Sequence, residues 1–150
     1  MNRLRKYIIP VLFAVAVASY GAYLIAGHVR AQKLLPVASR FADFFYASFN
    51  TGDYNRLYES AAFEGCSKCT IRLDKFKGIM QFVMERLGPV RTWTRTGYSV
   101  SEEGASTRIT MRFRVEHERG KSDERLVIVK KGDEWLLSDY NIASEALKKR

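Results

Sequence analysis

The chain has 150 residues, is 47% hydrophobic and carries a formal net charge of +9. Residues 1–33 hold five Lys or Arg and no acidic residue, so they account for +5, and three more cations lie at residues 148–150. The remainder is close to neutral and long enough for one domain with one core, which argues against a nucleic-acid-binding protein.

An uncharged apolar run extends from Tyr7 to Gly27 and follows three cations, Arg3, Arg5 and Lys6. A helix rises about 1.5 Å per residue, so this run reaches about 30 Å, the thickness of the hydrocarbon core of a bilayer. A cleavable signal peptide is the alternative, but its apolar region is typically about 7–15 residues long. We therefore predict an uncleaved anchor that makes contact with membrane lipid.

The distribution of cations around the anchor favours a cytoplasmic N-terminus. We predict a basic cytoplasmic tail at residues 1–6, a transmembrane anchor at 7–27 and a short polar stalk at 28–35. An extracytoplasmic domain at 36–143 and a basic tail at 144–150 complete the chain. This organisation is typical of a single-pass protein of the bacterial inner membrane with a periplasmic domain.

The domain begins with helical patterns. Apolar residues recur at spacings of three and four from Pro36 to Phe49, and Gly52 suits the left-handed position after a helix. Asp53 can cap a short second helix. A third helix is expected at about residues 71–87, before Gly88 and Pro89.

After Pro89 the apolar pattern repeats every second residue. We expect strands at about residues 90–99, 109–116, 126–129 and 134–142, joined by short turns in an antiparallel meander. Helices followed by strands predict an α+β domain, with about three helices packed on a curved four-stranded antiparallel sheet.

Three short sequences accompany this order of elements: Thr51-Gly52-Asp53-Tyr54, the LGPV of residues 87–90 and the GDEWLLSDYNI of residues 132–142. Together they make residues 36–142 similar to the nuclear-transport-factor-2-like superfamily, whose fold is an α+β cone. That superfamily includes enzymes, ligand-binding proteins and scaffolds. The resemblance therefore implies a fold and leaves the function open.

Cys66 and Cys69 are the only cysteines and are separated by two residues. A disulfide that closes a very short loop in an oxidising compartment is the interpretation we favour. A redox motif would need a thioredoxin-like context, and a metal site would need two more ligands where only His28 and His117 remain. We expect no metal and no cofactor.

The interior of such a cone can hold a small apolar ligand, and a carboxylate there would have a raised pKa suited to acid–base work. No residue matches a catalytic motif of the superfamily, so we expect no catalytic residue. The candidates for lining a ligand pocket are Phe41, Phe44, Phe45, Phe76, Phe82, Trp135, Asp43 and Asp139, with Tyr46, Tyr58, Tyr98 and Tyr140 as possible partners of a carboxylate.

The two first strands also predict a binding surface. Arg108, Arg112 and Arg114 share one face of the second strand, and Arg91, Trp93 and Arg95 share one face of the first. If these faces coincide, they form an arginine-rich patch with a central tryptophan, residue types that are enriched at binding hot spots. The alternative is an ordinary solvated face on which Glu116, Glu118 and Glu124 pair with the arginines.

These observations predict a non-catalytic interaction, accessory or assembly subunit of an inner-membrane complex, with a protein partner or a second copy bound to it. The alternative is a module or enzyme that holds a small apolar ligand inside the cone. A cavity of several hundred Å³ would favour the alternative, whereas a tightly packed interior would favour the interaction subunit.

Overall fold

The computed structural model describes the backbone of residues 2–61, 72–104 and 106–148. The chain divides into two compact units, Met1–Leu35 and Pro36–Arg150. The helix α1 (Asn2–Thr51) runs through the boundary between them. That boundary falls at Pro36, which has no N–H and so cannot make the helical hydrogen bond to the residue four positions earlier.

The first unit is helical from Asn2 onward, including residues 28–35, the predicted stalk. Most of the predicted anchor, residues 7–18 and 21–24, lies outside the residues whose side chains are described. Among those that are described, no helix is both long enough and apolar enough to cross a bilayer.

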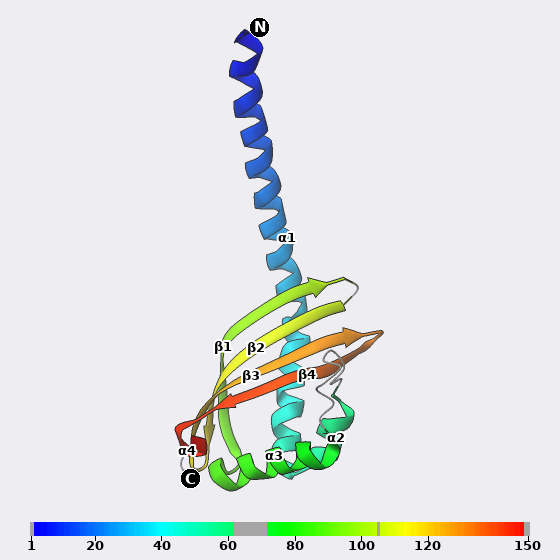
Figure 1. Ribbon diagram of the computed structural model, residues 1–150, viewed down its shortest axis with the longest axis vertical. Helices are drawn as coiled ribbons and strands as arrows, with labels where there is room; N and C mark the ends of the chain where they lie inside the picture. The colour runs from blue at the N-terminus through cyan, green and yellow to red at the C-terminus, as the bar shows by residue number, and fades with distance from the viewer. Residues whose placement is uncertain (1, 62–71, 105, 149–150) are drawn as a thin grey trace. The chain divides into compact units, whose positions relative to one another are not determined.

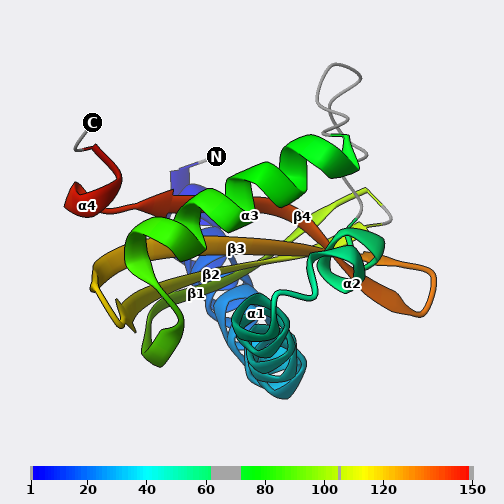
Figure 2. The ribbon, with the colours of Figure 1, turned by 90° about the horizontal axis from the view of Figure 1, so that it is seen from below.

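The second unit has the α+β architecture predicted from the sequence (Figure 1). After α1 come the helices α2 (Tyr54–Glu59) and α3 (Leu73–Leu87), then a four-stranded antiparallel sheet in the order β1-β2-β3-β4. Its strands are β1 (Val90–Glu103), β2 (Ser106–His117), β3 (Gly120–Lys131) and β4 (Glu134–Ala143), followed by the short helix α4 (Glu145–Lys148). Figures 1 and 2 show α2 and α3 together near the C-terminal end of α1.

The helix ends follow the sequence signals. Gly52 has the left-handed φ of 71° after α1, and the Asp53 carboxylate accepts the Arg56 backbone N–H at the start of α2. Gly88 ends α3 with a φ of 76°. Asn50 then joins α1 to β1, because its side-chain amide donates to the Val90 carbonyl at 2.9 Å and accepts the Val90 N–H at 2.7 Å.

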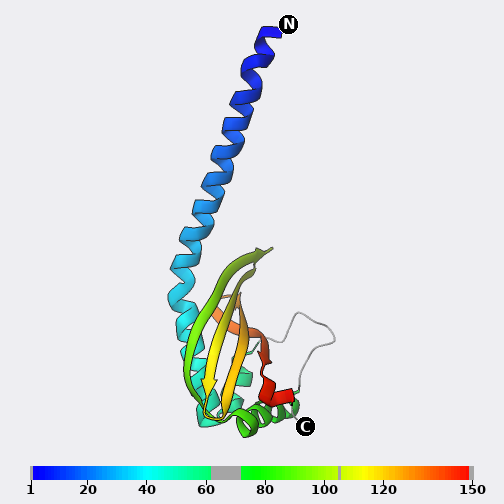
Figure 3. The ribbon, with the colours of Figure 1, turned by 90° about the vertical axis from the view of Figure 1, so that its left-hand side faces the viewer.

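The sheet is bent by irregularities in its register. Register shifts occur in β1 between Val90 and Thr92 and between Arg95 and Gly97, and a further one lies between β3 and β4 at Val127. Such bulges bend a strand and increase its twist. The resulting curvature is visible in Figure 3.

The core lies between the helices and one face of the sheet, here called the inner face. On β2 the inner residues are those at odd positions, and on β3 they are those at even positions. The largest completely buried side chains are Phe45, Phe49, Leu57, Met80, Val83, Leu87, Ile109, Met111, Phe113, Leu126, Ile128 and Leu137.

Candidate functional site

Five polar side chains meet inside the domain, and we call them the interior polar cluster: Tyr46, His117, Ser122, Glu124 and Tyr140. They come from α1, β2, β3 and β4. The side chains of His117 and Glu124 are each only 1% exposed. Strand alternation places them there, because His117 shares a face with Val115, and Glu124 shares a face with Leu126.

The Glu124 carboxylate is the centre of the cluster. Its Oε1 accepts the Ser122 hydroxyl at 2.7 Å and lies 3.0 Å from His117 Nε2. Its Oε2 accepts the hydroxyls of Tyr46 and Tyr140, each at 3.2 Å. Two carboxylate oxygens offer about four acceptor positions, so these four donors use all of them.

Both nitrogens of the His117 ring have polar neighbours. Nδ1 lies 3.1 Å from the carbonyl oxygen of Gly88, and Nε2 lies 3.0 Å from the Glu124 carboxylate. The Ser122 hydroxyl oxygen also lies 3.0 Å from Nε2. His117 thus links the carbonyl at the end of α3 to Glu124, with which it forms a buried ion pair when both ring nitrogens carry a proton.

The two tyrosines of the cluster are donors over the whole physiological pH range. Burial raises the pKa of Tyr46 and Tyr140 well above the usual value for tyrosine, and the nearby charge of Glu124 raises it further. Neither phenol can lose its proton at neutral pH. Both hydrogen bonds to Glu124 therefore persist.

Histidine, glutamate and tyrosine are the residue types of general acid–base catalysis. A general base, however, must reach a proton of the substrate, and here every acceptor position of Glu124 is taken by a neighbour within the domain. The arrangement instead ties together α1, β2, β3, β4 and the carbonyl group at the C-terminal end of α3. We interpret the cluster as a structural hydrogen-bond network that connects these elements.

The structure disperses the residues predicted to line a pocket. Phe41, Phe45 and Phe76 are buried, whereas Phe44 and Trp135 are half-buried. Phe82 is 43% exposed on α3, and the Arg86 guanidinium lies 5.4 Å from its ring centre.

The predicted carboxylates also lie away from the interior polar cluster. Asp43 is exposed on α1. Asp139 pairs with Arg125 at 2.6 Å on the outer face of the sheet, opposite the helices. Sequence reasoning missed the carboxylate that is buried, Glu124, which it assigned to the solvated face.

The predicted arginine patch is not continuous with Trp93. The register pairs Trp93 with Val115, which places the indole on the inner face, 5.8 Å from the ring of Tyr46 and 5.2 Å from that of Phe113. Arg112 and Arg114 lie on the outer face. The condition that the two faces coincide is therefore not met at Trp93, because the pairing register decides which side chains share a face.

The remaining arginines of that set are held by neighbours. Arg91 pairs with Glu118 at 3.6 Å, and the Arg95 guanidinium lies 5.7 Å from the ring centre of Tyr98 on the inner side of β1. Arg108 is half-buried on the outer face.

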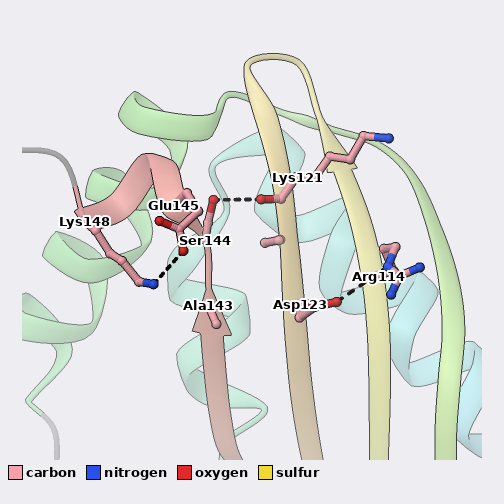
Figure 4. A pocket seen from close by; sticks show the side chains of 8 residues that line it. Arg114, Lys121, Asp123, Ala143, Ser144, Glu145 and Lys148 are labelled. Carbon is pink, nitrogen blue, oxygen red and sulfur yellow. Dashed lines mark hydrogen bonds and ion pairs between the residues drawn. The ribbon is translucent and has the colours of Figure 1, made fainter.

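A surface pocket of about 260 Å³ lies beside α4 (Figure 4). The charges around it are paired: Arg114 with Asp123 at 3.7 Å, Lys148 with Glu145 at 2.6 Å, and Lys121 with Glu116 of β2 at 2.6 Å. This pairing leaves the pocket without a surplus of either charge. It is lined by Arg114, Lys121, Ser122, Asp123, Ala143, Ser144, Glu145 and Lys148.

Cys66 and Cys69 lie outside the described residues, so the predicted disulfide stays a prediction. Over residues 2–61, 72–104 and 106–148, no three His, Cys, Asp or Glu side chains come together as a metal site would require.

The solved structures that resemble this fold include the two described next. A designed protein of the nuclear-transport-factor-2-like fold matches with a TM-score of 0.51 at 13% identity, over 71% of this chain and 96% of the designed chain. A Bdellovibrio bacteriovorus protein, Bd1075, matches with a TM-score of 0.49 at 11% identity, over 73% of this chain and 40% of its own. No protein-family model and no curated protein matches the chain. The likeness to the designed protein supports the predicted nuclear-transport-factor-2-like fold and nothing beyond the fold.

Proposed function

We propose that this protein is a single-pass protein of the bacterial inner membrane, with a periplasmic domain at residues 36–143. In this proposal the domain is a non-catalytic interaction, accessory or assembly subunit of a membrane complex. The anchor at residues 7–27 confines the domain near its partners and raises their effective concentration.

The observation that carries the non-catalytic role is the state of the domain interior. His117 and Glu124 are buried, Tyr140 is half-buried, and the acceptor positions of Glu124 are all occupied from within the domain. The neighbouring aromatic rings of Phe45, Phe49 and Phe113 are almost completely buried. A central carboxylate that is hydrogen-bonded from within the domain, among buried aromatic rings, supports binding at the outer surface instead.

A second function, an acid–base enzyme, is favoured by one observation only: His117, Glu124 and two tyrosines are concentrated in one place. For catalysis, α1 or α3 would have to move and expose Glu124 to a substrate. A Glu124→Gln variant separates the two roles, because an enzyme would lose turnover of its substrate while an interaction subunit would keep its partner as long as it stays folded.

The proposed function is tested by extracting the tagged full-length protein from its native membrane in a mild detergent. Particle mass and the identity of co-purifying molecules are then measured by mass spectrometry. We expect a protein partner in a fixed molar ratio. A protein that co-purifies only with a lipid or small metabolite would contradict the interaction role and support the ligand-binding alternative.

The proposed topology has its own test. Protease added outside spheroplasts should digest a tag placed at the C-terminus and spare a tag placed at the N-terminus. Digestion of the N-terminal tag alone would mean that the protein has the opposite orientation. Recovery of the protein in the fraction without membranes would contradict the proposed anchor.

A further inference from the structure

The helix α3, at the lower end of the domain in Figure 1, exposes apolar side chains on one side. Ile79 and Phe82 are 39% and 43% exposed, and in the second unit they are the large hydrophobic residues that are exposed among those with described side chains. Lys75 and Arg86 are also exposed. Spacings of four, three and four residues place these four on one side of the helix, and we call them the α3 stripe.

The core uses a different side of the same helix. Residues of α3 follow one another at about 100°, so the buried set, which also recurs at spacings of three and four, is turned away from the α3 stripe. Substitutions on the exposed side at Lys75 and Gly78 therefore leave the packed side of α3 intact. The buried residues of α3 are Phe76, Met80, Val83 and Leu87.

Gly78 lies beside the α3 stripe, and the fold does not require a glycine there. Its φ is not among the positive values that other glycines of the chain have. A Cβ on Gly78 would also have no neighbouring heavy atom within 4 Å. A glycine inside an exposed helix is less stable than an alanine at the same position, so Gly78 lowers stability without improving the packing of the domain. What it provides is open space next to Ile79 and one turn before Phe82.

The charges of the α3 stripe argue against a second copy as its partner. Lys75 lies at one end, and Arg86 lies at the other, with its guanidinium 5.4 Å from the ring centre of Phe82. Two copies of the stripe would bring cation against cation whether they packed parallel or antiparallel. Such contacts between like charges disfavour a partner, whereas carboxylates at both ends would favour it.

The acidic residues near the α3 stripe are accompanied by cations. Asp74 pairs with Arg72 at 3.5 Å. At the other end of α3, the Arg119 guanidinium donates to the carbonyl oxygen of Glu85 at 2.6 Å, so that Arg86 and Arg119 together outnumber the Glu85 carboxylate. The surface around the exposed apolar pair is therefore positive at both ends.

We propose that the α3 stripe binds an amphipathic helix of a partner protein, in which two apolar residues one turn apart lie between two carboxylates. The apolar residues would cover Ile79 and Phe82, and the carboxylates would reach Lys75 and Arg86. Paired helices lie about 8–10 Å apart, and a small residue such as Gly78 permits the closer distance. A fluid lipid surface adapts to any side chain and gains nothing from a glycine, so a helix fits this surface better. The inference rests on the proposed interaction role and specifies the chemistry of the partner.

The test uses the full-length protein in nanodiscs of phosphatidylcholine. The probe is a capped, dye-labelled, alanine-based helical peptide with two leucines one turn apart and a glutamate one turn beyond each of them. A second peptide has lysine in place of both glutamates, and empty nanodiscs are the blank. Binding is measured by fluorescence anisotropy. We expect the glutamate peptide to bind about tenfold more tightly than the lysine peptide, because charge-assisted contacts at both ends are replaced by repulsion.

Gly78→Gln is the decisive variant, because it fills the open space beside the stripe with a good helix former. We expect it to weaken binding of the glutamate peptide by about tenfold, while the Tm of the domain stays the same or rises. A purely structural role of Gly78 would not give a loss of binding with a gain in stability.

A pair of lysine variants separates a specific contact from the overall charge of α3. Lys75→Gln should weaken binding of the glutamate peptide by at least about threefold. Lys77→Gln is the matched control, because Lys77 has the same charge on the same helix but lies on another side of it. It should change the affinity by less than about twofold.

Several results would overturn the proposal: equal binding of the two peptides, no binding of the glutamate peptide, or a Gly78→Gln variant that binds as tightly as the original. Equal losses for Lys75→Gln and Lys77→Gln would overturn it as well. Hydrogen–deuterium exchange of α3 without peptide gives two more tests. Slower exchange in nanodiscs that contain phosphatidylglycerol would assign the stripe to anionic lipid, and slower exchange in a dimer would assign it to a second copy, each against the proposal.

The peptide titration is independent of the native complex. A peptide that does not bind, alongside a partner that co-purifies in a fixed ratio, refutes only the α3 stripe as the binding surface. A protein that has no native partner but binds the glutamate peptide refutes the interaction role and keeps the α3 stripe as a binding surface.

Discussion

Replacing Glu124 by alanine should destabilise the domain strongly. The substitution leaves the buried His117 ring without its carboxylate partner and removes the acceptor from three hydroxyl groups. Breaking a buried ion pair by removing one partner costs about 3–5 kcal/mol. For a domain slightly larger than 100 residues, we expect the Tm to fall by about 12–20 °C.

Unfolding of the full-length protein in micelles can be followed by tryptophan fluorescence. The two tryptophans of the chain, Trp93 and Trp135, both lie in the second unit, and Trp93 stacks on Tyr46 of the cluster. The matched control is Glu116→Ala, because this exposed carboxylate pairs with Lys121 at 2.6 Å and should be worth less than about 1 kcal/mol.

A double-mutant cycle sharpens the test. Losing His117 and Glu124 together should cost less than the sum of the single losses, because the double variant buries no unpaired charge. Additive losses, or a Glu124→Ala variant as stable as Glu116→Ala, would refute the buried ion pair. A Glu124→Ala variant more stable than the original would show that the carboxylate is kept for a function at the expense of stability.

Three further predictions concern other parts of the domain. The pKa of both phenols in the interior polar cluster is raised, so they stay protonated in the folded domain and ionise on unfolding above about pH 10. The free energy of unfolding should therefore fall by up to about 2.7 kcal/mol per pH unit above that pH. Equal free energies of unfolding in urea at pH 9 and pH 11 would contradict this. Asn50→Ala removes both hydrogen bonds to the Val90 backbone and should lower the free energy of unfolding in urea by about 1–3 kcal/mol. An unchanged urea midpoint of unfolding would show that these hydrogen bonds do not contribute to stability. Gly120→Ala places a Cβ 3.1 Å from Leu87 Cδ2 and should lower the free energy of unfolding by about 1–3 kcal/mol. Gly78→Ala meets open space on α3 and should raise the free energy of unfolding by about 1 kcal/mol. A higher Tm for Gly120→Ala than for Gly78→Ala would contradict the packing at Gly120.

The sequence was sufficient for the class of fold. The glycine after α1, the Gly-Pro pair after α3 and the change of apolar period at Val90 each mark a boundary that the structure has. These signals are local, since they depend on the backbone conformation of a few residues.

The burial of His117 and Glu124 in the interior polar cluster could also be predicted from the sequence. Extending the alternation of β2 beyond Val115 places His117 on the buried face, and extending that of β3 back from Leu126 places Glu124 beside it. Charged residue types had suggested a solvated face, although a charged side chain can be buried when it is paired.

The position of Trp93 could not be obtained in this way. Two bulges in β1 change which of its residues face the helices, and a bulge leaves no regular signal in the alternation of residue types. The pairing of Trp93 with Val115 depends on the register between two strands, which a single sequence constrains weakly where β1 is rich in threonine and serine.

The hydrogen bond from Tyr140 to Glu124 bears on the folding of the domain. Tyr46 lies on the first helix of the domain and Tyr140 on its last strand, so the carboxylate between them receives its full set of donors only when the C-terminal strand is in place. Contacts so distant in sequence form late and slow the folding of a chain. A chain that stops before β4 lacks the Tyr140 donor, so we expect the interior polar cluster to be completed only after the final strand has been synthesised.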